Sequence, residues 1–82
     1  QNYPNPFNPS TTINYSIPKE GLVKIKVFDI LGREVTQLVN SQMQAGTYKV
    51  EFNGAGLASG VYIYSLFVDN NLKSSKKMIL IK

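Results

Sequence analysis

Cysteine and histidine are both absent from this sequence of 82 residues. Without cysteine there is no disulfide and no thiolate metal site, so stability has to come from side-chain packing and strand pairing. Without histidine the chain lacks the commonest general base and the commonest ligand of transition metals. The five acidic residues fall mostly at predicted turns or solvent-facing positions, whereas glycoside hydrolysis needs two carboxylates across a cleft. We therefore expect a protein that is not an enzyme and holds no cofactor or metal.

Long hydrophobic runs are absent as well. No apolar stretch reaches the roughly 18 residues of a membrane-spanning helix, and no charged segment precedes the short apolar core of a signal peptide. We expect no stable membrane insertion. The sequence begins with Gln1 rather than methionine, so we expect a segment of a longer precursor whose export signal lies upstream.

Positive charge exceeds negative charge, with nine Lys and Arg against five Asp and Glu and a net charge of +4. Four of the nine cations fall within the last ten residues, at Lys73, Lys76, Lys77 and Lys82. Lysines beside aromatic residues also occur in proteins that bind single-stranded nucleic acid. Here the aromatics lie in a predicted core strand and the lysines are few, so we favour a solvated surface and expect no nucleic-acid partner.

Alternation of apolar and polar residues predicts β-strands and no helix. In the clearest case Val23, Ile25 and Val27 point inward, while Lys24 and Lys26 point to water. Residues 61–68 are instead apolar at almost every position, which predicts a central strand that is covered on both faces and is the most buried of all. The predicted strands are 11–17, 22–29, 34–39, 47–52, 61–68 and 72–82.

Glycine and small polar residues separate these strands. Asp29 to Gly32 has the composition of a tight turn, because Asp accepts a backbone hydrogen bond from two residues on and Gly tolerates positive φ. Residues 41–46 are expected to cross between two sheets, and residues 53–60 to form a loop from which Leu57 reaches toward the core. Residues 69–71 predict a hairpin turn, and a calcium site made of their side-chain oxygens is the less favoured alternative.

A chain of this length is expected to form one small domain. Residues 1–9 contain three prolines, so we expect a proline-rich linker over 1–9 and a folded domain over 10–82. Such an extended linker is also the expected neighbourhood of any proteolytic cleavage. Short strands at spacings of roughly 8 to 12 residues predict an all-β fold, an immunoglobulin-like antiparallel β-sandwich of about seven short strands.

Five blocks of the sequence carry a resemblance to a known family. In order and over essentially all 82 residues, they resemble the C-terminal sorting domain (type A) of cargo proteins of the bacterial type IX secretion system: NYPNPFNPSTTINYSIP, VKIKVFDILGREVTQLVN, AGTYKVEF, LASGVYIYSL and KKMILIK. A similar fold occurs in the immunoglobulin-like domain of flagellar hook-capping proteins, so the fold alone does not decide the function.

The resemblance implies a C-terminal secretion signal that directs a larger parent protein through the outer membrane. The implied partners are the type IX translocon, a sortase-like peptidase at the cell surface that removes the domain in many members, and the upstream domain of the parent. The implied location is the cell surface or the medium of a Gram-negative-type bacterium, reached through the periplasm. The alternative is an accessory structural or carbohydrate-binding sandwich of a multidomain secreted enzyme, which predicts a platform of exposed aromatics drawn from Tyr3, Phe7 and Phe28.

The family pattern maps onto three groups of positions, each with a structural reading beside the functional one. Glycines most simply serve turns and tyrosines most simply fill the core, whereas lysines at the end of the last strand add little to packing. The candidates for translocon recognition are Gly46, Tyr48, Lys76, Lys77 and Lys82; those for the proline-rich cleavage linker are Pro4, Pro6 and Phe7; the turn glycines are Gly32 and Gly60.

Overall fold

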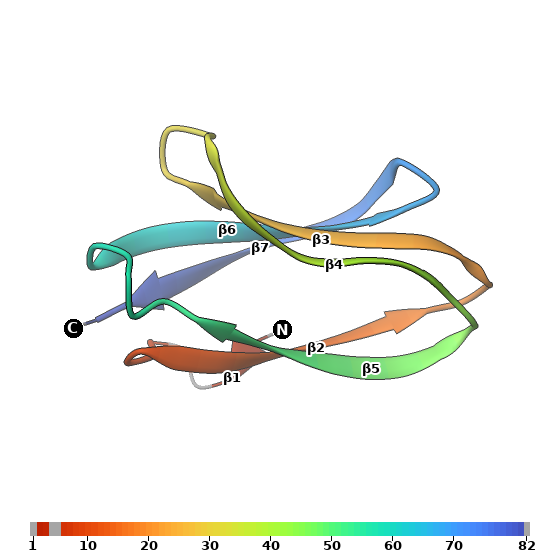
Figure 1. Ribbon diagram of the computed structural model, residues 1–82, viewed down its shortest axis with the longest axis horizontal. Coiled ribbons are helices and arrows are strands. Elements are labelled where there is room, and N and C mark those ends of the chain that lie inside the picture. The colour runs from red at the N-terminus through yellow and green to blue at the C-terminus, as the bar shows by residue number, and fades with distance from the viewer. Residues whose placement is uncertain (1, 4–5, 82) are drawn as a thin grey trace.

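A computed structural model of the chain describes residues 2–3 and 6–81. The regular elements of this part of the chain are seven β-strands (Figure 1). They are β1 (Asn2–Tyr3), β2 (Ser10–Ile17), β3 (Gly21–Asp29), β4 (Glu34–Met43), β5 (Gly46–Asn53), β6 (Gly60–Val68) and β7 (Asn71–Leu80). Pro4 and Lys82, both named above as candidates, lie outside the described residues.

The strands form two sheets that face one another. One sheet has the order β1-β2-β5 and the other has the order β4-β3-β6-β7, and neighbouring strands are antiparallel throughout. The predicted immunoglobulin-like antiparallel sandwich is therefore confirmed. Its long dimension is 36 Å and its radius of gyration is 12.3 Å, as expected of a single small domain.

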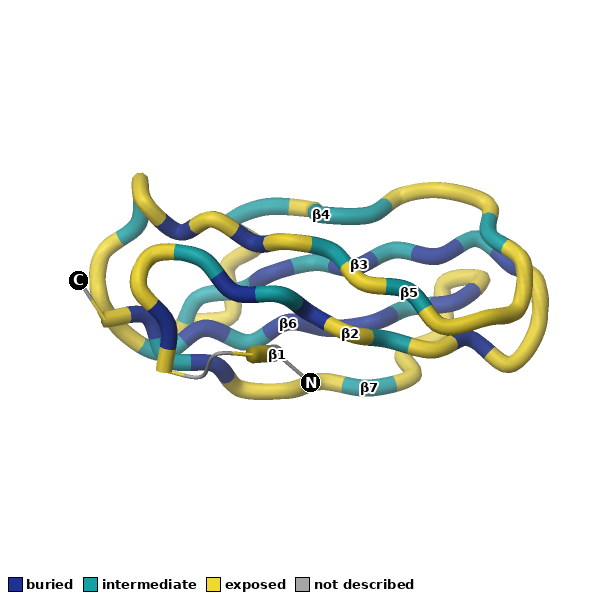
Figure 2. Tube along the Cα trace, turned by 90° about the horizontal axis from the view of Figure 1, so that it is seen from below, coloured by how far each residue is buried: buried dark blue, intermediate teal, exposed yellow. Residues whose placement is uncertain are grey.

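Alternating sequence patterns place the core. In β3 the side chains of Val23, Ile25 and Val27 are at most 1% exposed, and Lys24 and Lys26 between them are only partly covered. This confirms the predicted register, in which one face of each strand is buried. The interior holds two neighbouring clusters of buried side chains, and Figure 2 shows buried residues recurring along the strands of both sheets.

The crossing between β4 and β5 was predicted correctly, but its length was not. β4 continues to Met43, so only residues 44–45 connect the two sheets. The polar residues 40–42 and Met43 are paired with residues 21–24 of β3, whose backbone groups need partners whatever side chains lie opposite. A polar stretch beside a regular strand is thus drawn into the ladder.

The expectation that β6 is covered on both faces is wrong, although β6 is a central strand between β3 and β7. Its inward face carries the buried side chains Tyr62, Tyr64, Leu66 and Val68. The opposite face is half-buried at Val61, Ile63 and Phe67, because a two-layer sandwich has one interior and neighbouring strands give the outer face only partial cover. There Lys26 Nζ lies 5.8 Å from the Phe67 ring centroid, and buried Ser65 shares a hydrogen bond of 2.8 Å with Ser75.

The proline-rich segment touches both sheets. β1 pairs with residues 12 and 13 of β2, whereas Phe7 forms a parallel bridge with Leu80 of β7. The Phe7 N–H donates to the Ile79 carbonyl and the Ile81 N–H donates to the Phe7 carbonyl, both at 2.9 Å. The Phe7 ring is 2% exposed and packs edge-on against Phe52, with ring centroids 5.8 Å apart. The expectation that Phe7 lies outside the core is therefore wrong.

This placement of Phe7 has a simple physical cause. A large aromatic ring next to the open edge between two sheets gains more by filling that edge than by staying in water. The division of the chain into residues 1–9 and 10–82 stays a prediction. The described part of the segment nevertheless joins the two sheets, so we name residues 2–3 and 6–9 the closing segment.

The register of β3 predicts the effect of a charge at its centre. Val27→Asp places a carboxylate without a partner at a fully buried position, and a domain of this size has only about 5 kcal/mol of stability to lose. We expect no cooperative thermal unfolding of this variant by circular dichroism. The matched control Leu72→Asp, at a side chain that is 59% exposed, should melt almost like the unmodified domain.

The closing segment makes a second prediction about stability. Phe7→Ala should lower the free energy of unfolding by about 3–5 kcal/mol, because it leaves a cavity between the sheets. Tyr3→Ala, in the same segment but at a ring that is 79% exposed, should have a much smaller effect. Urea denaturation measures both, and equal stability of the two variants would show that the segment is a linker after all.

Candidate recognition site

Gly46 and Tyr48 stand at the start of β5, where the chain has just crossed between the sheets. Gly46 has φ +157°, a value that side chains disfavour, and a Cβ there would lie 3.6 Å from atoms of the Tyr48 ring. The ring folds back along the strand, and its hydroxyl donates to the Gln44 carbonyl at 2.6 Å. It also stacks on Tyr15 of the neighbouring strand, with centroids 5.6 Å apart.

Gly60 and Tyr62 repeat this arrangement at the start of β6. Gly60 has φ +155°, and the Tyr62 hydroxyl donates to the Ala58 carbonyl at 2.7 Å. In both places the sequence is Gly-x-Tyr and the hydroxyl returns to a carbonyl four residues upstream, as in the tyrosine corner of immunoglobulin-like domains. Our sequence reasoning missed these bonds, although the repeated Gly-x-Tyr spacing at two strand starts was the available signal.

Gly32 lies in the hairpin between β3 and β4 with φ +84°. The Asp29 carboxylate organises this turn by accepting hydrogen bonds from the backbone N–H groups of Leu31 at 2.9 Å and Arg33 at 3.0 Å. It also pairs with Arg33 Nε at 2.8 Å. The Arg33 backbone N–H is the main reason why the pKa of Asp29 lies below its ordinary value, although partial desolvation opposes the shift.

The two described lysine candidates lie in the middle of β7, an edge strand of its sheet, and not at the end of the last strand as expected. Lys76 is opposite Tyr64 and Lys77 is opposite Ile63, and both lysines are exposed. Because side chains alternate along a strand, Lys76 lies on the face of buried Met78 and Lys77 on the outer face. The two lysines therefore lie on opposite faces of the sheet.

The structure does not bring the candidates together in one site. Gly46 and Tyr48 lie at the end of the sandwich formed by residues 18–20, 44–45 and 69–70, whereas Phe7, Gly32 and Gly60 lie at the opposite end (Figure 1). The lysines stand between these ends. Pro6 is exposed beside buried Phe7, so the expected cleavage linker contains both an accessible and an inaccessible position.

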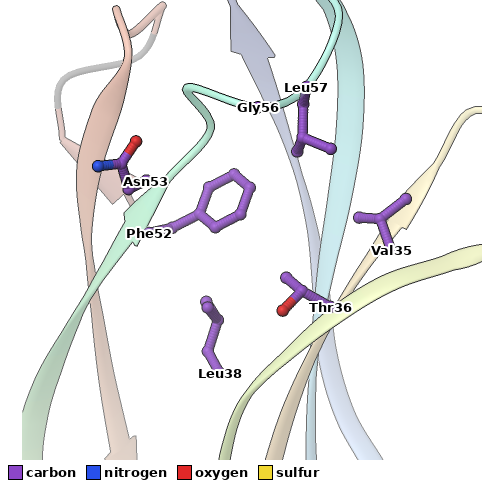
Figure 3. A pocket seen from close by; sticks show the side chains of 7 residues that line it. All are labelled: Val35, Thr36, Leu38, Phe52, Asn53, Gly56 and Leu57. Carbon is purple, nitrogen blue, oxygen red and sulfur yellow. The ribbon is translucent and has the colours of Figure 1, made fainter.

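A cavity of about 270 Å³ opens between the two sheets beside Phe52 (Figure 3). Leu57 reaches it from the loop before β6 and packs against the core, as predicted. The walls of the cavity are both apolar and polar and contain no ionisable side chain: Val35, Thr36, Leu38, Phe52, Asn53, Gly56 and Leu57. This cavity offers no acid–base pair for catalysis.

Two alternatives from the sequence find little support. The hairpin turn predicted at residues 69–71 is formed by Asp69 and Asn70, with φ of 52° and 66°, because β7 already begins at Asn71. The side-chain oxygens of Asp69 and Asn70 accept hydrogen bonds from Leu22 N–H and Lys24 Nζ. Among the described residues no group of three or more His, Cys, Asp and Glu side chains is placed to hold a metal ion. Tyr3 and Phe28 lie in different sheets, so they form no common platform for a sugar.

Fold and site together define a small immunoglobulin-like sandwich whose candidate positions lie at strand starts, turns and an edge strand rather than in a catalytic cleft. The chain belongs to the family of secretion system C-terminal sorting domains, whose model matches residues 1–82. Comparison with curated proteins and with solved structures gave no match.

Membership of this family assigns the function. The domain is the C-terminal sorting signal of a cargo protein of the type IX secretion system, so it interacts with the secretion machinery. Its parent passes through the periplasm to the outer membrane, the cell surface or the medium. The family consists of sorting signals and not of enzymes. In the described part of the chain no helix has the length and apolar character needed to span a membrane.

Three tyrosines allow a direct test of the hydroxyl bonds. Tyr48→Phe and Tyr62→Phe each remove a hydrogen bond to a carbonyl, so each should cost about 1 kcal/mol and lower Tm by roughly 4–8 °C. The Tyr64 hydroxyl is buried without a hydrogen-bond partner among the described residues, and burial raises the pKa of Tyr64. Tyr64→Phe should therefore leave Tm unchanged or raise it. Equal Tm changes in all three variants would contradict this assignment.

Proposed function

We propose that this domain is a sufficient address by itself: the translocon recognises the folded sandwich, and the domain performs no chemistry of its own. The observation that carries this proposal is that the family model spans residues 1–82 and that the described part of this span closes its own core. An autonomously folded module can be read in the same way on many different parents. The upstream domain of the parent is then cargo and not part of the signal.

Lys76 and Lys77, together with Lys82, are our proposed contacts for the secretion machinery. Both described lysines are exposed on an edge strand, where they contribute little to the core. Lysines on an edge strand also discourage another strand from pairing with it. The machinery is therefore proposed to contact the lysine charges and not to add a strand to this edge. Gly46 and Tyr48 act differently in this proposal, because their geometry shapes the start of β5 and supports recognition through the fold.

We further propose that a sortase-like peptidase at the cell surface removes the domain on the N-terminal side of Phe7. Phe7 is buried, and its N–H and carbonyl groups are both hydrogen-bonded to the end of β7. A peptidase needs an extended, accessible backbone, which the exposed Pro6 side of the segment offers more readily. Pro4, Pro6 and residues upstream of them are thus better cleavage candidates than Phe7.

Export of a reporter tests this proposal. A stable reporter with an N-terminal export signal and these 82 residues at its C-terminus should reach the surface or the medium of a host with a type IX translocon. It should stay in the periplasm of a strain that lacks the translocon. Periplasmic retention of a folded fusion in the intact host would contradict the proposal and favour an accessory sandwich.

The lysines are tested in the same reporter. Lys76→Ser combined with Lys77→Ser should leave most of the fusion in the periplasm without lowering its Tm. The control is Lys19→Ser with Lys49→Ser, which removes the same charge from two exposed lysines elsewhere. Equal export of both double variants would show that these lysines are not contacts.

A further inference from the structure

The hairpin between β3 and β4 carries two large aliphatic side chains in water. Ile30 and Leu31 are each 73% exposed and adjacent in sequence, whereas the other exposed large hydrophobic residues occur singly, at Tyr3, Leu72 and Ile81. Figure 1 shows this hairpin projecting away from the sandwich. We call Ile30 and Leu31 the hairpin tip.

The backbone of the hairpin tip is held in one conformation before any partner arrives. In addition to its carboxylate bonds, Asp29 donates its N–H to the Arg33 carbonyl at 2.9 Å and accepts the Gly32 N–H at 3.0 Å. These bonds use backbone groups and the Asp29 and Arg33 side chains, and none uses the side chain of Ile30 or Leu31. The requirements of the turn therefore account for Asp29 and Gly32, but they do not account for Ile30 and Leu31.

Charge at the base of the hairpin is compensated. Asp29 pairs with Arg33 at 2.8 Å, and Lys26 pairs with Glu34 at 3.4 Å. Much of the excess positive charge lies elsewhere, on β7, at Lys73, Lys76 and Lys77. The hairpin tip is thus a neutral apolar projection on a molecule of net charge +4.

This charge balance discriminates between possible partners. Surfaces that bind anionic membranes combine apolar side chains with uncompensated lysines and arginines, which the base of this hairpin does not offer. A neutral apolar projection matches an uncharged apolar pocket on a protein. A rigid turn also favours such a contact, because little conformational entropy is lost when it docks.

We propose that the hairpin tip inserts into an uncharged apolar pocket of the secretion machinery, with Asp29 as the residue that positions it. This inference rests on the proposed function, in which the machinery recognises the folded domain. It adds a recognition surface at two residues that are not among the candidates named from the sequence, and this surface is separate from the lysines of β7.

Reporter export tests the hairpin tip with a matched control. Ile30→Ser combined with Leu31→Ser should reduce export by roughly tenfold or more, the loss expected when an aliphatic side chain no longer leaves water. Leu72→Ser, which removes an exposed apolar side chain elsewhere, should be exported normally. Ile30→Leu combined with Leu31→Ile keeps the apolar character of both side chains, so this variant should retain most of the export of the unmodified domain. Melting of each isolated domain checks that it is folded.

Asp29→Asn separates positioning from contact. It keeps both aliphatic side chains but weakens the bonds that fix them, so export should fall less than with the double serine variant. Two further measurements compare the double serine variant with the unmodified domain. Both proteins should bind equally to vesicles of phosphatidylcholine and phosphatidylglycerol, and both should sediment equally at high protein concentration.

The outcomes of these experiments either support the inference or overturn it. Normal export of the folded double serine variant overturns this inference and leaves the proposed function standing, whereas failure of the unmodified domain to direct export overturns both. Vesicle binding that depends on the hairpin tip assigns it to a lipid surface, and self-association that depends on it assigns it to a second copy of the chain. Either of these outcomes also overturns the inference.

Discussion

The burial of the Phe7 ring between the two sheets is the contact on which the rest of this small domain depends. A chain without cysteine has no disulfide between its layers, so apolar side chains from both sheets have to meet and exclude water. Phe7 contacts Phe52 of one sheet and is hydrogen-bonded to the last strand of the other. A segment that is rich in proline and looks like a spacer in the sequence thereby closes the structure.

The two Gly-x-Tyr corners stabilise the connections before β5 and β6, also without a disulfide. Each tyrosine hydroxyl satisfies a carbonyl just before a strand, where the backbone has left one ladder and not yet joined the next. The ring of Tyr48 is half-exposed and that of Tyr62 is buried, yet both make the same bond. A sorting domain carried by different parents needs the same shape each time, and these corners fix the positions at which strands begin.

Sequence reasoning succeeded where the physical cause is local. Alternation located β2 and β3 to within a residue, and the composition of residues 29–32 and 69–71 identified both turns. It failed where the cause lies across the chain. The length of β4 depends on the ladder with β3, the partial exposure of β6 depends on the number of layers, and the burial of Phe7 depends on a strand more than seventy residues away.

The candidate residues show the same division. Glycines and tyrosines could be selected from their spacing, but the bonds of the tyrosine hydroxyls to carbonyls four residues upstream, and the separation of the candidates at opposite ends of the sandwich, required the structure. The hairpin tip was overlooked because Asp29 to Gly32 already explained a turn. Only the 73% exposure of both aliphatic side chains shows that neither of them packs within the domain.

The parallel bridge between Phe7 and the end of β7 has a mechanical consequence for a protein that is moved through a membrane. The cargo of a C-terminal sorting signal is attached upstream of Phe7, and Ile79 and Ile81 lie at the other end of the described residues. When these two points are pulled apart, the bonds of the Phe7 N–H and carbonyl are loaded together in shear instead of opening one after the other. Once the short pairing of β1 with β2 has opened, a pull on the cargo therefore meets two bonds at Phe7 that have to break together.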